Sequence, residues 1–292
     1  MGKLIVTGVL GRLGRAIAAE ASARGWSVVG VDRVAASGEM PDNVETVLGS
    51  FEDFTLMATL MKDASHLIHT SGLHGGDVAT HTLPEFIRSN VENAARLIEL
   101  ALEHKIRNIC LSSTMEVLVG RDWSASGCSV LDEMSPLQTD SAYSISRSLQ
   151  ERLAGEMSRR RDISVSLLRY VAFGYCEDHE LGASLLARRI TARDAARAAL
   201  LAVGKDDLRG EVFNIGPQSP LTNRDIVEAL VDPRGVLEKY FPGASEVLDK
   251  SGLSISAEHF WPVTSIAKAN RLLNWQPEFT FETWLGLHGW TR

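Results

Sequence analysis

The stretch that decides the fold is residues 7–14, Thr7-Gly8-Val9-Leu10-Gly11-Arg12-Leu13-Gly14. Its glycines recur at every third position, directly after an apolar run and directly before a segment with helical spacing. Glycine at these positions permits a tight turn, a close approach of the backbone to a pyrophosphate, and close packing of the helix against the strand. The free N–H groups and the dipole of the helix N-terminus favour the same anion. The stretch therefore predicts a dinucleotide-binding turn, with contacts from Gly8, Leu10, Gly11, Arg12, Leu13 and Gly14.

Around this turn, short apolar runs alternate with segments of helical periodicity. The predicted strands are residues 4–6, 27–31, 44–48, 66–69, 109–111 and 165–170, and the predicted helices between them are residues 13–24, 54–62, 84–104 and 143–159. Such alternation with apolar strands is typical of a parallel sheet covered by helices on both faces. We therefore predict an α/β fold with a Rossmann-type, doubly wound parallel sheet.

The later part of the chain is less regular. A predicted helix at residues 193–203 and a predicted strand at residues 211–215 repeat the alternation, and Thr222 is the predicted N-cap of a further helix. We predict that residues 1–172 form a dinucleotide-binding domain to which residues 191–216 return. Residues 173–190 and 217–292 are then predicted to form a smaller, C-terminal substrate-binding region.

The composition is that of an ordinary globular protein, with 45% hydrophobic and 23% charged residues among 292. The formal net charge of -7 disfavours a nucleic-acid-binding protein that depends on a basic face. No apolar run approaches the ~18 residues of a membrane span, and the sequence begins without a signal-peptide pattern. We therefore expect a cytoplasmic protein with a small-molecule substrate and with no nucleic-acid or membrane partner.

The end of the second predicted strand supplies a candidate ligand for the adenosine ribose. Asp32 follows Gly14 at close to the ~20 residues expected for such an acid. A carboxylate there accepts hydrogen bonds from the ribose hydroxyls and repels a 2′-phosphate, which favours NAD over NADP. Arg33 follows directly and would hold a 2′-phosphate if its side chain turned inward. NADP therefore stays open as the alternative cofactor.

Further motifs follow in order along the chain. They are Asn90-Val91-Glu92-Asn93-Ala94-Ala95, Ser112-Ser113-Thr114-Met115-Glu116-Val117, Tyr143-Ser144-Ile145-Ser146-Arg147, Leu168-Arg169-Tyr170, Glu211-Val212-Phe213-Asn214-Ile215-Gly216 and Leu272-Leu273-Asn274-Trp275-Gln276-Pro277. With the glycine-rich turn they resemble the extended short-chain dehydrogenase/reductases, the NAD-dependent epimerase/dehydratase family. The resemblance spans nearly the whole chain. It implies NAD as cofactor, a carbohydrate-like substrate and a homodimer.

The same resemblance assigns Tyr143 as the acid/base, Thr114 as its hydroxyl partner, and Arg147 as the cation beside them. Oxidation of an alcohol removes a hydroxyl proton while hydride leaves the carbon. A tyrosine, with an ordinary pKa of ~10, can take that proton if a nearby positive charge favours its anion. A side chain four residues later lies on the same helix face and can supply that charge. Ser113 is the alternative hydroxyl.

Two positions depart from the family pattern. Arg147 replaces the lysine of the family's YxxxK motif, and a guanidinium keeps the charge but does not act in a proton relay. Met115 replaces the aspartate of the Asp-Glu pair found in dehydratases of the family, which argues against sugar 4,6-dehydration. Glu116 remains, either as a second acid/base or as a helix-capping acid.

The remaining assignments also rest on the resemblance, and on the rule that ligands bind at the carboxyl edge of such sheets. The expected further cofactor contacts are Ser50, Phe51, Thr70, Ser71, Gly72, Asn90, Ser112 and Tyr170, in addition to Tyr143 and Arg147. The expected substrate contacts are Ser113, Thr114, His74 and Arg193. For Arg193, a solvated or ion-paired helix face is the alternative. The histidines at 66, 69, 74 and 81 cluster in sequence, but we predict no metal site, because His69 sits where the family's strand-four motif has its histidine.

The leading hypothesis is an NAD-dependent oxidoreductase or epimerase that acts on a sugar-like hydroxyl through a ketone intermediate. The segment after residue 169 is short, which favours a substrate smaller than a nucleotide sugar. An epimerase and a dehydrogenase would use the same tyrosine and hydroxyl, so the sequence leaves both open. The alternative is a nicotinamide-nucleotide-binding regulatory protein with weak or lost catalysis, which the substitution at Arg147 favours.

Overall fold

The computed structural model describes residues 2–119, 129–174 and 178–291. Its described strands form one seven-stranded sheet in the order β3-β2-β1-β4-β5-β6-β7, and all neighbours pair in parallel. The strands are β1 (Lys3–Thr7), β2 (Ser27–Asp32), β3 (Val44–Leu48), β4 (Ala64–His69), β5 (Asn108–Thr114), β6 (Ser164–Tyr170) and β7 (Glu211–Ile215). The predicted doubly wound α/β fold is confirmed.

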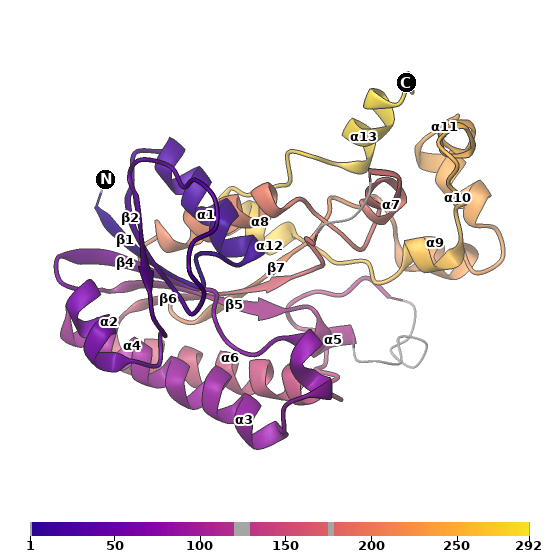
Figure 1. Cartoon of the computed structure of the whole chain (residues 1–292). Helices are drawn as coiled ribbons and strands as arrows, with labels where there is room; N and C mark the ends of the chain where they lie inside the picture. Colours follow the sequence, from indigo (N-terminus) through magenta and orange to yellow (C-terminus); the bar gives the residue numbers. More distant parts are fainter. Residues whose placement is uncertain (1, 120–128, 175–177, 292) are drawn as a thin grey trace.

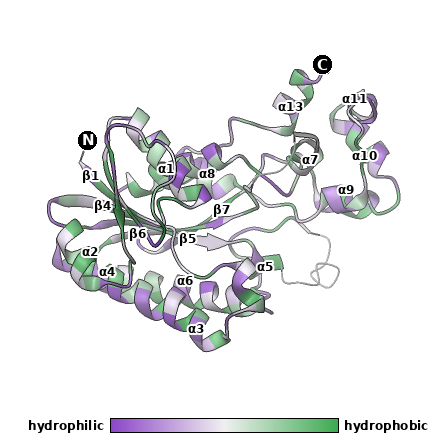
Figure 2. Cartoon of the chain, in the orientation of Figure 1, coloured by the Kyte–Doolittle hydropathy of each residue, from purple (hydrophilic) through white to green (hydrophobic). Residues whose placement is uncertain are grey.

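Helices cover both faces of the sheet (Figure 1). One face carries α1 (Arg12–Ala23), α8 (Ala192–Val203) and α12 (Ala267–Leu273), and the other carries α2 (Phe54–Leu60), α4 (Asn93–Glu103) and α6 (Ala142–Arg161). Leu4 and Val6 of β1 belong to the core on one face, whereas Ile5 between them belongs to the core on the other. Because both faces are buried, the central residues of β1 and its neighbours are mostly apolar, as the hydropathy colours of Figure 2 show.

The strand order reverses between β1 and β4. In open parallel sheets, ligands bind outside the carboxyl ends of the strands at this switch point. The turn after β1 and the loop after β4 therefore meet where a cofactor is expected. The loop after β4 contains the short helix η1 (Gly75–Ala79), and a short helix α5 (Glu116–Val119) follows β5.

A smaller helical lobe lies beyond the carboxyl edge of the sheet (Figure 1). It consists of α7 (Asp178–Ser184), α9 (Asn223–Glu228), α10 (Pro233–Tyr240), α11 (Ala244–Lys250), η3 (Ala257–Phe260) and α13 (Phe281–Leu287). α8 and β7 lie between its segments in sequence but belong to the sheet layers. The region expected at residues 173–190 includes residues 175–177, which lie outside the described residues. No described helix is long and apolar enough to cross a membrane.

Asp194, on α8, anchors the last segment of the lobe to the sheet domain. Its buried carboxylate accepts hydrogen bonds from the backbone N–H groups of Glu278 at 2.7 Å and Phe279 at 3.2 Å. The indole N–H of Trp275 donates to the backbone carbonyl of Asp194 at 3.0 Å. The segment around residues 275–279 is thereby fixed against α8 through a charged acceptor, and hydrogen bonds of this kind are stronger than those between neutral groups.

One predicted helix differs in the structure. Residues 84–104 form α3 (Leu83–Ile87), a π-helical turn η2 (Arg88–Glu92) and α4 rather than one continuous α-helix. The wider turn contains Asn90, whose side chain bonds both backbone groups of Leu73 in the loop after β4. Single π-turns of this kind occur frequently at functional sites, and hydrophobic periodicity alone does not reveal them.

Candidate active site

The turn between β1 and α1 forms a tight cradle. Gly8 has a φ of +72° and donates its N–H to the carbonyl of Val31 at 2.8 Å. A Cβ added to Gly14 would lie 2.0 Å from the Gly8 carbonyl oxygen, so only glycine allows α1 to start this close to the turn. Gly11 and Arg12 are exposed at the start of the helix. This backbone meets the spatial requirements of pyrophosphate binding at a helix N-terminus.

Asp32 ends β2 beside this cradle. One of its carboxylate oxygens accepts the N–H of Leu10 at 2.9 Å, and the other accepts that of Val34 at 3.3 Å. Arg33 next to it is exposed. The hydroxyl of Ser50, after β3, accepts the N–H of Glu52 at 3.2 Å. The structure therefore brings the predicted ribose carboxylate directly to the glycine-rich turn.

The loop after β4 packs on the opposite side of the same turn. The hydroxyl of Thr70 donates to the carbonyl of Thr7 at 2.7 Å, and a Cβ on Gly8 would lie 2.9 Å from Ser71 Oγ. Gly72 has a φ of +126°, and a Cβ there would lie 2.4 Å from Asn90 Oδ1. Asn90 is fully buried and fixes this loop through the backbone of Leu73, and it also donates to the hydroxyl of Ser146 on α6 at 2.9 Å.

Thr114 and Tyr143 lie at the carboxyl edge, on β5 and at the start of α6. The Thr114 hydroxyl accepts the N–H of Glu116 at 3.2 Å. A Cβ added to Gly75 would lie 3.2 Å from Glu116 Oε1 and 3.6 Å from Tyr143 Cδ1. Glu116 and Tyr143 therefore flank Gly75, and the residues expected to do acid/base chemistry gather around the loop after β4.

Arg147 lies one turn after Tyr143 with its guanidinium carbon 5.4 Å from the centroid of the Tyr143 ring. The residue is only 3% exposed. Its Nη1 donates to the carbonyl of Ser112 at 3.1 Å and to Gln150 Oε1 at 3.0 Å. No ion pair with a carboxylate is found for it among the described residues. The ionisable side chain beside this buried guanidinium is that of Tyr143.

His69, at the end of β4, is held in its neutral form beside this cation. Burial and, to a smaller extent, the charge of Arg147 lower the pKa of His69 to about 3. Its Nδ1 is 2.7 Å from the hydroxyl of Thr7, and its ring contacts Phe51 edge-on at 4.8 Å. His69 therefore adds no second positive charge to the site at neutral pH.

Comparison with known proteins identifies the family of this chain. Residues 4–192 match the model of the NAD dependent epimerase/dehydratase family. The chain belongs to this family.

One relative of this chain, the dTDP-glucose 4,6-dehydratase of Streptomyces antibioticus, is 26% identical to it over 226 residues. The match covers 68% of the chain and 64% of the relative, less than two thirds of the relative's length. The structure of MoeE5 in complex with UDP-glucose and NAD is similar with a TM-score of 0.69 and 22% identity, over 100% of this chain and 99% of that one. A mutated uronate dehydrogenase is similar with a TM-score of 0.68 and 18% identity, over 98% and 85%. Likeness at these identities shows the shared fold.

Several predicted site residues have other partners in this structure. Ser113 donates to Glu151 Oε1 at 2.6 Å, and Glu151 forms a buried ion pair with Arg169 at 2.7 Å. Ser113 pairs with Arg169 across β5 and β6, so both side chains lie on the α6 face of the sheet. Its hydroxyl therefore belongs to a structural network, and Thr114 is the hydroxyl at the carboxyl edge.

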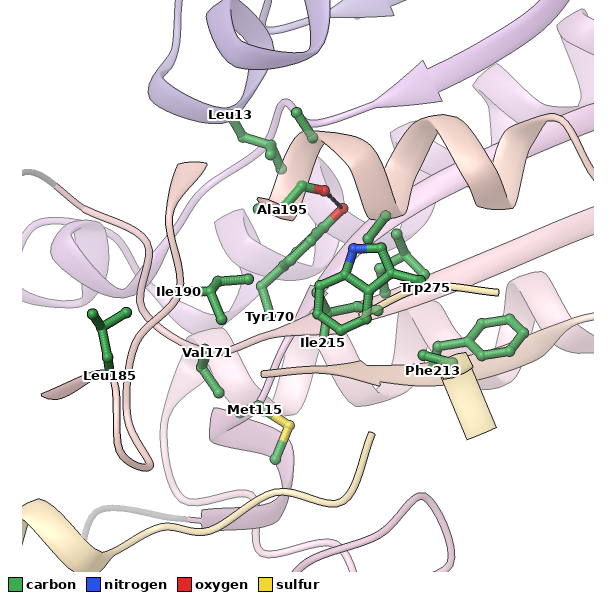
Figure 3. Packing of buried hydrophobic residues seen from close by; sticks show 14 of the residues in the cluster. Leu13, Met115, Tyr170, Val171, Leu185, Ile190, Ala195, Phe213, Ile215 and Trp275 are labelled. Carbon is green, nitrogen blue, oxygen red and sulfur yellow. Dashed lines mark hydrogen bonds between the residues drawn. The ribbon is translucent and has the colours of Figure 1, made fainter. Parts of the chain in front are cut away.

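Tyr170 and Phe51 lie in the two cores. Tyr170 is 5% exposed and donates to the carbonyl of Ala195 on α8 at 3.4 Å, as Figure 3 shows. Burial raises the pKa of Tyr170 well above its ordinary value, so its phenol stays protonated. Phe51 is 6% exposed and packs in the other core. Both side chains are therefore nearly enclosed by their cores.

Arg193 and His74 are exposed, and both have local partners. Arg193 bonds Glu20 of α1 at 2.6 Å, and this contact raises the pKa of the guanidinium. It is also 4.0 Å from Glu278, so it joins α8 to α1 and to the C-terminal segment. The Nδ1 of His74 accepts the N–H of Gly76 at 2.9 Å and caps η1. In the structure, Arg193 therefore lies on an ion-paired helix face, which is the alternative stated for it in the sequence analysis.

One residue at the site was missed by the sequence analysis. Gln150 lies three residues after Arg147 and is its side-chain partner. The signal was available, because residues three apart on a helix are neighbours. Glutamine carries no charge and belongs to none of the motifs, so nothing in the sequence marked it as part of the site.

Proposed function

We propose that this protein is an NAD-dependent oxidoreductase or epimerase that acts on a hydroxyl of a sugar or sugar-like molecule through a ketone. The observation that supports this most directly is the position of Tyr143 beside the buried guanidinium of Arg147, 5.4 Å from its ring centroid. The two lie at the same sheet edge as Thr114 and the glycine-rich turn. The family supports the cofactor and the carbohydrate class.

The cradle fits a dinucleotide, because the glycine backbone leaves room for a pyrophosphate and Asp32 stands where a ribose would lie. When bound, the nicotinamide ring supplies the acceptor for a hydride. The phenolate of Tyr143 takes the proton of the substrate hydroxyl as general base. The hydroxyl of Thr114 holds the same substrate oxygen, and the charge of Arg147 favours the phenolate. Residues 70–72 would line the nicotinamide, and a Cβ built on Gly72 of this loop would lie 3.2 Å from Nη2 of Arg147.

Met115 supports an epimerase or dehydrogenase over a 4,6-dehydratase. Its side chain is 4% exposed and packs in the core, so the position has neither a carboxylate nor access to a substrate. Glu116 is exposed and flanks Gly75, where it can act as a second acid/base.

We further propose that residues 173–190 and 217–292 hold the substrate, and that it is smaller than a nucleotide sugar. The short lobe supports a free sugar acid, a polyol or a similar molecule. Arg189 donates to the carbonyl of Gly174 at 3.1 Å, and Arg188 lies 4.0 Å from Glu258. Both arginines of the lobe therefore already have partners within the protein.

The test of this function is a spectrum of the purified protein followed by a substrate screen. Nicotinamide that is retained through purification would favour an epimerase, whereas its absence would favour a dehydrogenase that releases it. Free sugars, uronates and polyols are then tested with NAD. NAD binding without turnover on any of them would favour the regulatory alternative. The Nη1 donors of Arg147 also support that alternative, because Ser112 and Gln150 already accept their hydrogen bonds.

We expect NAD to bind about tenfold more tightly than NADP, because the carboxylate of Asp32 repels a 2′-phosphate. Asp32→Ala should weaken NAD binding and reduce the preference for NAD over NADP. Asp32→Asn is the matched control, since its amide oxygen still accepts the N–H of Leu10 but carries no charge. Titration of each variant with both dinucleotides measures the preference. NADP binding as tight as NAD in the unmodified protein would show that Arg33 dominates the ribose site.

We propose a homodimer formed through α4 and α6. Leu149 and Leu153, one turn apart on α6, are 43% and 38% exposed, and Val91 and Ala95 border a shallow hollow next to Leu153. The double variant Leu149→Glu/Leu153→Glu should convert a dimer to a monomer, because it buries charge in an apolar contact. Sedimentation velocity measures the change, and an exposed site elsewhere, Val231→Glu, is the control. A sedimentation coefficient that is the same in both variants would exclude this face as the dimer interface.

A further inference from the structure

The guanidinium of Arg147 is held by acceptors from three different segments. Nη1 donates to the carbonyl of Ser112 at the end of β5, at 3.1 Å, and to Oε1 of Gln150 on α6, at 3.0 Å. Nη2 is 3.5 Å from the carbonyl of Leu73 in the loop after β4. The first two contacts use both N–H groups of Nη1. Gln150 is the one side chain among these acceptors, and it is 2% exposed.

The pair also has one unpartnered donor on each side chain. Nε of Arg147 and Nε2 of Gln150 are buried and have no hydrogen-bond partner among the described residues. Buried polar atoms of this kind are uncommon and often belong to functional sites. A Cβ on Gly72 would lie 3.2 Å from Nη2 of Arg147, so the absence of a side chain at Gly72 leaves room for the guanidinium.

We propose that Gln150 is a positioning residue that fixes the guanidinium of Arg147 beside Tyr143 and directs its Nη2 toward the cofactor loop at residues 70–72. This inference rests on the proposed function for the identity of the cofactor and of the reacting tyrosine. Gln150 acts through Arg147 and is not expected to touch the substrate. It would allow arginine to serve at a position where the family pattern has lysine.

The absence of charge on the Gln150 side chain is as important as its length. An amide oxygen orients the guanidinium without cancelling its charge, whereas a carboxylate at the same place would form an ion pair and weaken the field at Tyr143. The nearest acid on the same helix, Glu151, is already paired with Arg169. The other ionisable side chains on elements that contact α6 are Asp77, Glu85, Arg88, Glu92, Arg96, Glu99, Glu103, Cys110, Glu116 and Tyr170. His69, on β4, is neutral beside Arg147.

Two substitutions separate orientation from charge. Gln150→Met keeps the length of the side chain but removes the acceptor, and it should weaken NAD binding about tenfold. Gln150→Glu keeps an acceptor but adds a negative charge. It should move the pH dependence of turnover upward by about one unit, because a higher pH is then needed to deprotonate Tyr143. Thr59→Glu, on the exposed face of α2, is the control for the added charge and should leave the pH profile in place.

A double-mutant cycle tests whether Gln150 acts through Arg147. In an Arg147→Met background, Gln150→Met should produce no further loss of NAD affinity, because residues that act as a unit are not additive. Additive losses would overturn the inference, as would an unchanged NAD affinity in Gln150→Met alone. Calorimetric titration with NAD measures these effects without turnover. If the protein proves to have no enzymatic activity, the cycle still decides the inference, and a loss of thermal stability identifies variants that fail to fold.

Discussion

Tyr143→Phe should lower turnover by about 10²–10⁴, the usual contribution of a general acid/base. The substitution removes only the phenolic oxygen. The ring keeps its place near Phe86, at 6.4 Å between centroids, and its contact with the guanidinium of Arg147. NAD affinity and thermal stability should therefore stay close to those of the unmodified protein. Steady-state rates on the substrate found by the screen, together with NAD titration, measure the effect.

Tyr170→Phe is the matched comparison for this experiment. It removes a phenol of the same kind, but this one donates to Ala195 inside the core. It should reduce stability by about 1 kcal/mol, the net value of one hydrogen bond, and change turnover far less than Tyr143→Phe. Equal losses at the two positions would mean that a general effect on folding explains both. Unchanged turnover in Tyr143→Phe would remove Tyr143 from the mechanism.

Arg147→Lys should lower turnover by about tenfold or more rather than restore a family-like site. The structure supports this outcome because the guanidinium reaches Ser112 and Gln150 through one nitrogen and Leu73 through another. An ammonium is a single compact donor group and cannot span these acceptors in the same way. Arg147→Met should lower turnover further, because it also removes the positive charge. It should also move the pH optimum of turnover upward.

The pH profile separates the two contributions of Arg147. Arg147→Lys keeps a positive charge, so its profile should stay close to that of the unmodified protein even as the rate falls. Arg147→Met should shift it. A lysine variant with higher turnover than the unmodified protein would show that the site is still shaped for lysine. NAD binding that is alike in all three proteins, with no turnover in any, would leave the regulatory function as the better explanation.

The parts of the site that depend on local sequence were predictable. The glycine-rich turn, Asp32 at the end of β2, and the spacing of Tyr143 and Arg147 on α6 each follow from the conformation of one segment. The seven-stranded sheet followed from alternation alone. These features require no knowledge of how distant segments meet.

What the sequence did not show depends on which way a side chain faces. Ser113 and Thr114 are adjacent hydroxyl residues on a strand buried on both sides, so apolar patterning does not say which of them faces α6. The register with Arg169 settles it. Phe51 and Tyr170 match family positions, but their rings fill the cores of this chain. The π-helical turn at Asn90 accompanies hydrogen bonds to Leu73 in another segment, which local periodicity does not reveal.

The anchor at Asp194 has a consequence for exchanging substrate specificity between relatives. Because Trp275, Glu278 and Phe279 bond to α8, the segment at residues 275–279 is held by the sheet domain, although the lobe helices η3 and α13 lie on either side of it in sequence. A chimaera that replaced everything after β7 would separate a buried carboxylate from its donors. A graft that ends before Trp275 retains them. An exchange of the segment between β7 and Trp275 therefore needs two junctions rather than one, and it leaves α7 and α13 of the lobe unchanged.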